Sequence, residues 1–249
     1  MKGLRTRARL FGLGLVIALA SIGSAHADSW DLPRVQTYES ADKNWRFVAT
    51  PRRLESQLAY FDEAMAREKA GAGPRPADQR AQGKLEHRVQ GQWRPVWAGP
   101  LLNDVGPVSA LVSQTGRVVT FDNWHSTGYG NNVVVIYDDK GATVRSMALK
   151  DFLPEDYLYA LPNSVSSVQW YGDHAISADG QRLIVRVVAP GTDPELDEPR
   201  YIEVNFDLAT GRRLPGDQRA WNRALRQAAQ IAKKVRAEEA AREAGSSRP

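Results

Sequence analysis

The chain has 249 residues, of which 33 are basic and 29 acidic, and it contains no cysteine. Four of the basic residues lie within the first nine positions, so the rest of the chain carries equal numbers of positive and negative groups. Nucleic-acid binding draws on clustered positive charge, so we expect no nucleic-acid partner. The absence of cysteine excludes a disulfide framework.

Residues 1–27 have the three parts of a cleavable secretory signal peptide. The basic residues within positions 2–9 precede an apolar run at Leu10–Ala20, and residues 25–27 (Ala-His-Ala) place alanines at the cleavage positions. The apolar run is about half of the roughly 20 residues that span a bilayer. We therefore expect a periplasmic or secreted protein with no stable membrane insertion after cleavage.

The segment after the signal peptide predicts a short strand followed by a helix. Residues 28–44 are polar with scattered aromatics and indicate an irregular lead-in, whereas Trp45–Ala49 alternates as a strand does. A helix is expected next, because Thr50 offers an N-cap hydroxyl and Pro51 suits the first helical position. Its apolar stripe, which should pack against a sheet, consists of Leu54, Leu58, Phe61 and Met65.

From Gly83 to Leu214 the chain predicts successive β-strands within one domain, residues 28–216. Short hydrophobic runs are joined by turns that contain Gly or Asp, with no helical crossover between them, so the sheets should be antiparallel. The expected strands are Lys84–Val89, Trp93–Trp97, Val108–Val112, Arg117–Phe121, Val133–Tyr137, Thr143–Met147, Ser167–Tyr171, Ala175–Ile176, Arg182–Val188 and Tyr201–Phe206.

Several of these strands resemble the blades of β-propellers. Residues 108–149 form one four-stranded unit, and the phrases SQTGRVVTFD, IYDDKGATVR and SADGQRLIVRV resemble WD40-like and YVTN-like blade strands. The WD40 Trp-Asp signature is absent, and only about three such units fit, whereas a closed propeller has at least four blades. We expect a mainly β fold with antiparallel sheets, in a partial propeller-like or sandwich arrangement.

The segment VVTFDNWHSTGYGNNVVVIYD is also similar to an uncharacterised family of exported bacterial proteins, which implies no activity.

Residues 217–249 predict one long helix with a frayed end. Its apolar residues recur at helical spacing, so its first half should dock on the β domain. These residues are Trp221, Leu225, Ala228, Ala232 and Val235.

Two segments have the composition of a binding site. FDNWHSTGYGNN at residues 121–132 is too long for a tight turn and combines hydrogen-bonding groups, aromatic rings and glycines, while WYGDH at residues 170–174 has a similar mixture. Asp and Asn also satisfy turns, and a Trp can simply seal a core. If both segments lie on one rim, they form a shallow platform for a sugar or a protein. The candidate ligand-binding residues are Asp122, Asn123, Trp124, His125, Tyr129, Tyr171, Asp173 and His174.

No catalytic, metal or cofactor motif is assembled in the sequence. His125 and Asp122 could act as a general base and its orienting acid, but residues three apart on an extended strand point to opposite faces. There is no G-x-S-x-G elbow, and the histidines after the signal peptide lie in separate β segments. We therefore predict no catalytic residue, no metal site and no cofactor.

Three functions remain open at this point. The first is an exported, non-catalytic module that binds a protein or glycan partner in the cell envelope. The second is an envelope hydrolase that uses His125 with Asp122 or Asp173. The third is a scaffold protein assembled through the C-terminal helix. Convergence of Asp122, His125, Asp173 and His174 in one cleft would favour the hydrolase.

Overall fold

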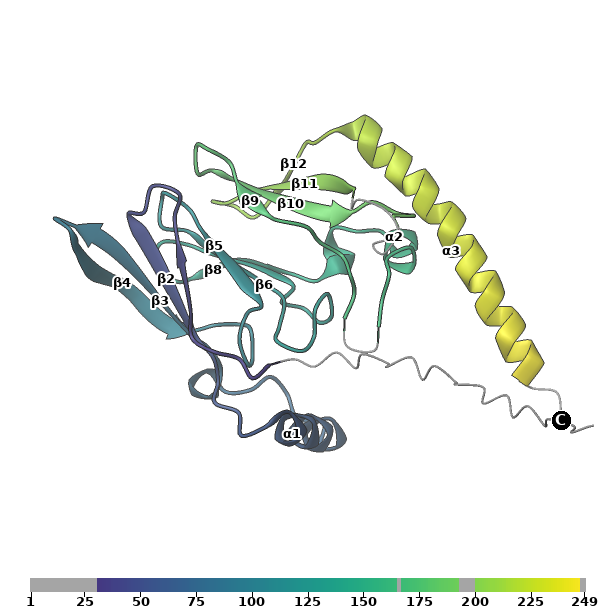
Figure 1. The fold of residues 1–249 in the computed structure, drawn as a ribbon, viewed down its shortest axis with the longest axis horizontal. Coiled ribbons are helices and arrows are strands. Elements are labelled where there is room, and N and C mark those ends of the chain that lie inside the picture. The colour runs from purple at the N-terminus through teal and green to yellow at the C-terminus, as the bar shows by residue number, and fades with distance from the viewer. Residues whose placement is uncertain (1–30, 165–166, 193–199, 247–249) are drawn as a thin grey trace, which may run out of the picture.

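The computed structural model describes residues 31–164, 167–192 and 200–246. The predicted signal peptide lies outside these residues. The fold consists of three four-stranded antiparallel sheets, one helix near the N-terminus and a long C-terminal helix (Figure 1), and the sheets do not close into a barrel. The predicted fold class is confirmed. Within the described ranges, no helix combines the length and apolar character needed to cross a membrane.

Each sheet takes its four strands in chain order, as an antiparallel meander. The first sheet contains β1 (Gln36–Glu39), β2 (Trp45–Thr50), β3 (Gln82–Val89) and β4 (Gln92–Pro100). The second contains β5 (Ser109–Val112), β6 (Val118–Phe121), β7 (Val134–Tyr137) and β8 (Thr143–Met147). The third contains β9 (Ala175–Ile176), β10 (Arg182–Val188), β11 (Tyr201–Asp207) and β12 (Arg213–Leu214). Because β5 contacts both β1 and β9, the sheets meet along their first strands (Figure 1).

Two clusters of buried side chains hold the three sheets together. One lies between the first and second sheets and includes Phe47, Leu85 and Tyr137, while the other joins the second and third sheets around Trp170 and Phe206. Alternation along the strands builds both, because successive side chains of a strand point to opposite faces. In β2, for example, Phe47 and Ala49 are buried, whereas their neighbours are only partly covered.

Turn glycines of the second sheet allow the first sheet to approach closely. Gly116 and Gly141 both have a positive φ, and a Cβ on either would lie within 3 Å of Trp45 or Trp97 respectively. Only glycine meets both conditions at low cost, because it tolerates a positive φ and carries no side chain.

The two ends of the sheet assembly differ: ion pairs lie on the first sheet, whereas a helix packs on the third. On the first sheet, Glu86 is nearly buried between Arg46 and Lys84, with which it forms ion pairs. At the other end, α3 (Gln218–Ser246) packs on β11 and on the short helix α2 (Glu155–Tyr159), as Figure 1 shows. The predicted docking of the first half of α3 is confirmed, since its buried side chains are Ala224, Ala228 and Ala232.

The N-proximal helix, α1 (Gln57–Lys69), begins six residues later than the sequence pattern predicted. Its N-cap is Ser56, whose Oγ accepts a hydrogen bond from the Ala59 N–H at 3.1 Å. The predicted start at Thr50 and Pro51 is wrong, because the Arg52 N–H instead donates to the Val105 carbonyl at 2.8 Å. A tertiary hydrogen bond therefore keeps this segment out of the helix.

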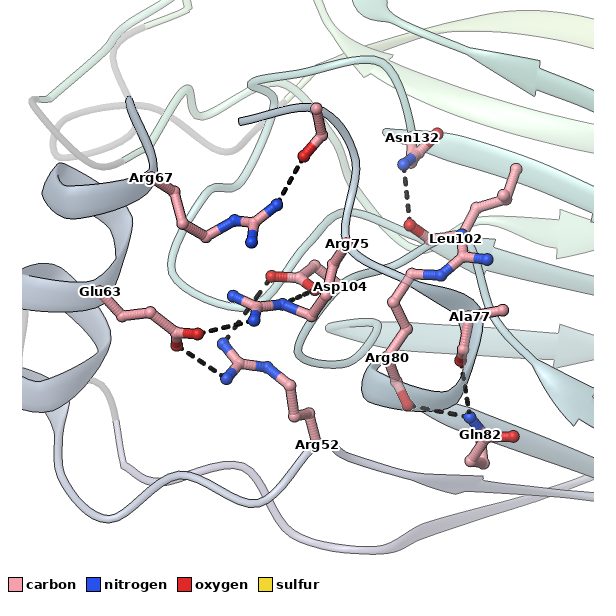
Figure 2. Close-up of polar contacts among 11 residues, drawn as sticks. Arg52, Glu63, Arg67, Arg75, Ala77, Arg80, Gln82, Leu102, Asp104 and Asn132 are labelled. Carbon is pink, nitrogen blue, oxygen red and sulfur yellow. Dashed lines mark hydrogen bonds and ion pairs between the residues drawn. The ribbon is translucent and has the colours of Figure 1, made fainter. Parts of the chain in front are cut away.

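The predicted burial of the α1 stripe is also wrong. No residue of α1 is buried, and the side chains of Leu58 and Met65 are 75% and 61% exposed. Ion pairs help to anchor the helix: Glu63 binds Arg52 at 2.9 Å and Arg75 at 2.6 Å (Figure 2). Arg75 also binds Asp104 at 2.8 Å, which ties α1 to the loop that follows the first sheet.

Two further local predictions are corrected. The lead-in at residues 28–44 is not wholly irregular, because Gln36–Glu39 pairs with β2 as β1. The predicted strand Ser167–Tyr171 does not form, since Ser167 and Tyr171 take part only in isolated bridges. Two short 3-10 turns, η1 (Ala77–Gln79) and η2 (Leu149–Asp151), lie in the connections.

Candidate functional site

The loop at residues 121–132 is held from inside the core by Asp122. This residue is fully buried and has a φ of 56°. Its carboxylate accepts a hydrogen bond from the Gly128 N–H at 2.6 Å and from the Trp170 indole N–H at 3.2 Å. The Asn103 side chain donates to the Asp122 carbonyl at 2.6 Å. Asp122 therefore fixes the shape of the loop from below and contributes no surface of its own.

His174 lies in the same buried region. Its ring stacks near Phe121, with centroids 4.2 Å apart, and lies 5.1 Å from Trp170. Its Nδ1 accepts a hydrogen bond from the Arg186 backbone N–H at 3.2 Å. Because Nδ1 is an acceptor, a neutral His174 carries its proton on Nε2.

Burial shifts the pKa values of Asp122 and His174 in opposite directions, upward for the carboxyl group and downward for the imidazole. Desolvation raises the pKa of Asp122 to about 7, against the opposing hydrogen bonds from Gly128 and Trp170. Desolvation, together with the smaller effect of the positive charge of Arg186, lowers the pKa of His174 to about 3. His174 is therefore neutral at pH 7 and serves as a flat ring within the core.

Trp124 and His125 face α1 rather than a common rim with Tyr171. Trp124 is only 5% exposed; its indole N–H donates to the Asp31 carbonyl at 3.0 Å, and its ring meets that of Tyr60 edge-on. His125, with a φ of 62°, packs edge-on against Phe61 at 4.7 Å. The expected platform of exposed aromatics is wrong, because α1 and the residues around Asp31 cover Trp124.

The eight predicted residues therefore divide among three environments. Asp122, Tyr171 and His174 surround Trp170. Trp124 and His125 lie on the α1 side. Asn123, Tyr129 and Asp173 are partly or largely exposed.

This division does not favour the hydrolase. The Asp122 carboxylate bonds to Gly128 and Trp170, whereas His125 packs on the opposite side of the loop against α1. In the part of the chain that the structure describes, no group of three or more His, Asp or Glu is placed to hold a metal ion.

A pocket of about 470 Å³ opens beside the loop, and no residue of α1 lines it. Loop residues 128–131 form one wall, and Ala148–Lys150, Leu158–Tyr159, Asn163 and Val168 form the rest. Its volume lies within the range typical of ligand pockets, and its lining is predominantly apolar, as is usual for such sites.

Two tyrosines stand at this pocket with their rings partly in solvent. Tyr129 is 38% exposed, and its hydroxyl donates to the Ser164 carbonyl at 2.9 Å. Tyr159, on α2, is 39% exposed and lies under the guanidinium of Arg236 at 4.4 Å. Hydrogen bonding and the cation–π contact thus hold both rings in place before any ligand arrives.

Gly128 allows the loop to pack closely on the core at this pocket. Its φ is 77°, and a Cβ at this position would lie 2.7 Å from Val168 and 3.1 Å from Trp170. The loop can therefore pass directly over the core, and the Asp122 bond to the Gly128 N–H fixes that passage.

Of the predicted site residues, only Tyr129 lines this pocket. Sequence reasoning missed Lys150, Leu158, Tyr159 and Asn163, which follow β8 or belong to α2 and its exit. The only signal available for them was a Tyr-rich segment, DYLY at residues 156–159. Nothing in their spacing indicated that they would meet the loop.

Searches with protein-family models and against curated proteins returned no match to this chain. Its function is therefore inferred from the geometry and chemistry of the pocket.

Proposed function

We propose that this chain is an exported, non-catalytic binding module, and that its partner in the cell envelope binds at the pocket beside Tyr129 and Tyr159. The observation that carries this proposal is the pocket itself: about 470 Å³, mostly apolar, and flanked by two restrained tyrosines. A partner that covers half-exposed rings gains apolar burial at low cost in side-chain entropy, because a tyrosine has few rotatable bonds.

Export is part of the same proposal and rests on residues 1–27. Cleavage after Ala27 would leave Asp28 as the first residue. In a bacterial host, N-terminal sequencing of the protein from a periplasmic or culture-medium fraction should begin at Asp28. Intact Met1 on protein recovered from the cytosol as its main form would overturn this part.

The binding site is tested with Tyr129→Ala and Tyr159→Ala, alone and combined. Tyr201→Ala is the matched control, because Tyr201 has the same exposure, 38%, but does not line the pocket. Peptide and envelope-glycan arrays are probed with the cleaved form of each protein. We expect the double variant to lose the captured ligands by at least about tenfold, equivalent to about 1.4 kcal/mol.

Circular dichroism and unfolding curves show whether each variant is folded. Capture that is equal in the folded double variant and in the Tyr201→Ala protein would place the binding surface elsewhere and refute the assignment.

A further inference from the structure

The charge of the pocket indicates the sign of the charge on its ligand. Lys150 is the only charged residue in the lining. Among the lysines that the structure describes, only Lys84 and Lys234 form ion pairs, so the Lys150 ammonium has no carboxylate partner there. At a partly apolar surface, a charge pair is stronger than in bulk water, because the surrounding dielectric constant is lower. An anionic ligand group therefore complements this pocket.

The apolar lining indicates a second feature of the ligand, an apolar group. Leu149 is buried, and Leu158 and Val168 are partly buried, and all three line the pocket together with Tyr129 and Tyr159. A bare sugar ring offers little to the aliphatic part of this lining, whereas a branched or aromatic side chain loses its contact with water there. The Asn131 amide stands in solvent at the edge and can pair with a backbone N–H or C=O group.

The anionic group and the apolar group must lie close together in the ligand, because one pocket of about 470 Å³ contains both the apolar lining and Lys150. The last residue of a peptide supplies both, since it carries an apolar side chain and a carboxylate on the same Cα. A fatty acid also combines the two groups, but its chain needs a long enclosed channel, and this pocket is wide and open to solvent between two half-exposed tyrosines.

We infer that the pocket binds the free C-terminus of a peptide that ends in an apolar residue. The terminal carboxylate pairs with the Lys150 ammonium, and the last side chain packs on Leu149, Leu158 and Val168. This inference rests on the proposed function and narrows its partner from protein or glycan to a protein C-terminus.

The test uses the cleaved protein and a peptide library with all twenty residues at the last position and random residues before it. The library is synthesised once with free C-termini and once as C-terminal amides, and affinities of enriched peptides are measured by fluorescence polarisation. We expect enrichment of Leu, Ile, Val, Met or Phe at the last position, and at least about tenfold weaker binding of each amide.

Lys150→Met provides the specific readout. This substitution should lower the affinity for the free-acid peptide to that for the amidated peptide, and should leave the affinity for the amidated peptide unchanged. The effects of Lys150→Met and of C-terminal amidation are then not additive. Lys140→Met is the matched control, because Lys140 lies in the exposed β7–β8 turn and should leave both affinities unaltered.

The possible outcomes distinguish a failure of this inference, that the ligand is a peptide C-terminus, from a failure of the proposed function, that the pocket is the binding site. Tyrosine-dependent binding of a glycan or a fatty acid without any preference for a free peptide C-terminus would overturn this inference and leave the pocket as the binding site. Peptide binding that ignores amidation or the Lys150→Met change would also overturn it. Absence of any Tyr129- or Tyr159-dependent ligand would refute the proposed function itself.

Discussion

The buried Asp122 and the half-buried His174 both contact Trp170, and their protonation is linked to folding with opposite sign. The pKa of Asp122 is about 7 in the folded chain, above its ordinary 3.8, so folding takes up a proton between these values. The contribution of Asp122 to stability therefore falls as the pH rises from about 4 to 7. The pKa of His174 is about 3, below its ordinary 6.5, so folding releases a proton and its contribution rises with pH from about 3 to 6.5.

Between about pH 4 and 6.5, Asp122 and His174 change the free energy of unfolding with pH in opposite directions. Single substitutions should separate the two contributions. Relative to the wild type, Asp122→Asn should gain stability with rising pH across this window, and His174→Asn should lose stability, each by up to about 1.4 kcal/mol per pH unit. Urea unfolding at several pH values measures both slopes.

Other charges around the pair do not alter the signs. Burial, and to a smaller extent the charge of Asp122, raises the pKa of the Tyr171 phenol. Arg186 adds to the effect of burial in lowering the pKa of His174. Asp173→Asn is the control, since this neighbour is exposed. Parallel stability–pH curves for the wild type, Asp122→Asn and His174→Asn would show that neither group titrates as described.

At the scale of elements, the helices are attached by different means. α1 is held in part by the ion pairs of Glu63 with Arg52 and Arg75. Leu58 and Met65 of its apolar stripe are mostly exposed. α3 is held by small buried side chains, and its Arg236 also binds Asp156 at 2.7 Å and lies over Tyr159. Since Tyr159 lines the pocket, α3 supports one wall of the proposed site.

The exposure of the α1 stripe predicts a contrast between two identical substitutions. Leu58→Ala should change the free energy of unfolding by no more than about 0.5 kcal/mol, because Leu58 is mostly in solvent. Leu85→Ala, in the core between the first and second sheets, should cost about 2–5 kcal/mol. Urea titrations of the two variants provide the comparison. A loss at Leu58 that approaches the loss at Leu85 would mean that the Leu58 side chain is packed against the protein.

At the scale of the whole molecule, α3 completes the core of the second and third sheets. Trp221 stacks on Tyr157 with centroids 5.8 Å apart and receives the guanidinium of Arg213 over its ring. Ala224 and Ala228 belong to the same buried cluster as Phe206. Without α3, this apolar surface would meet water.

Deletion of α3 should therefore destabilise the molecule far more than deletion of its distal end. Ending the chain at Gly216 should reduce the free energy of unfolding by roughly 3–6 kcal/mol, from the lost burial of Trp221, Leu225 and Ile231 together with the alanines. Ending it at Glu239 keeps the docked half and the Arg236 contacts, and should change that energy by less than about 0.5 kcal/mol. Equal stability of the two truncated chains, measured by urea unfolding, would contradict this role.

Local patterns predicted much of the fold. Most strands, the antiparallel order and the docking of α3 follow from alternation, turn residues and helical spacing, which act between near neighbours in the chain. The start of α1 does not follow from them, because the Thr50-Pro51 pattern is overridden by the bond between the Arg52 N–H and the distant Val105 carbonyl. The polar strand β1 is stabilised by its pairing with β2 rather than by its own pattern.

The sequence by itself therefore determined the mainly β character, the antiparallel pairing of most strands, and the presence of α1 and α3. Tertiary structure alone decided the candidate site. It buried Trp124 under α1, placed Asp122 beneath the loop, and brought Tyr129 to Lys150 and Tyr159. The physical reason is range: strand and helix signals come from residues a few positions apart, whereas a pocket forms where distant segments meet, and no local periodicity encodes that meeting.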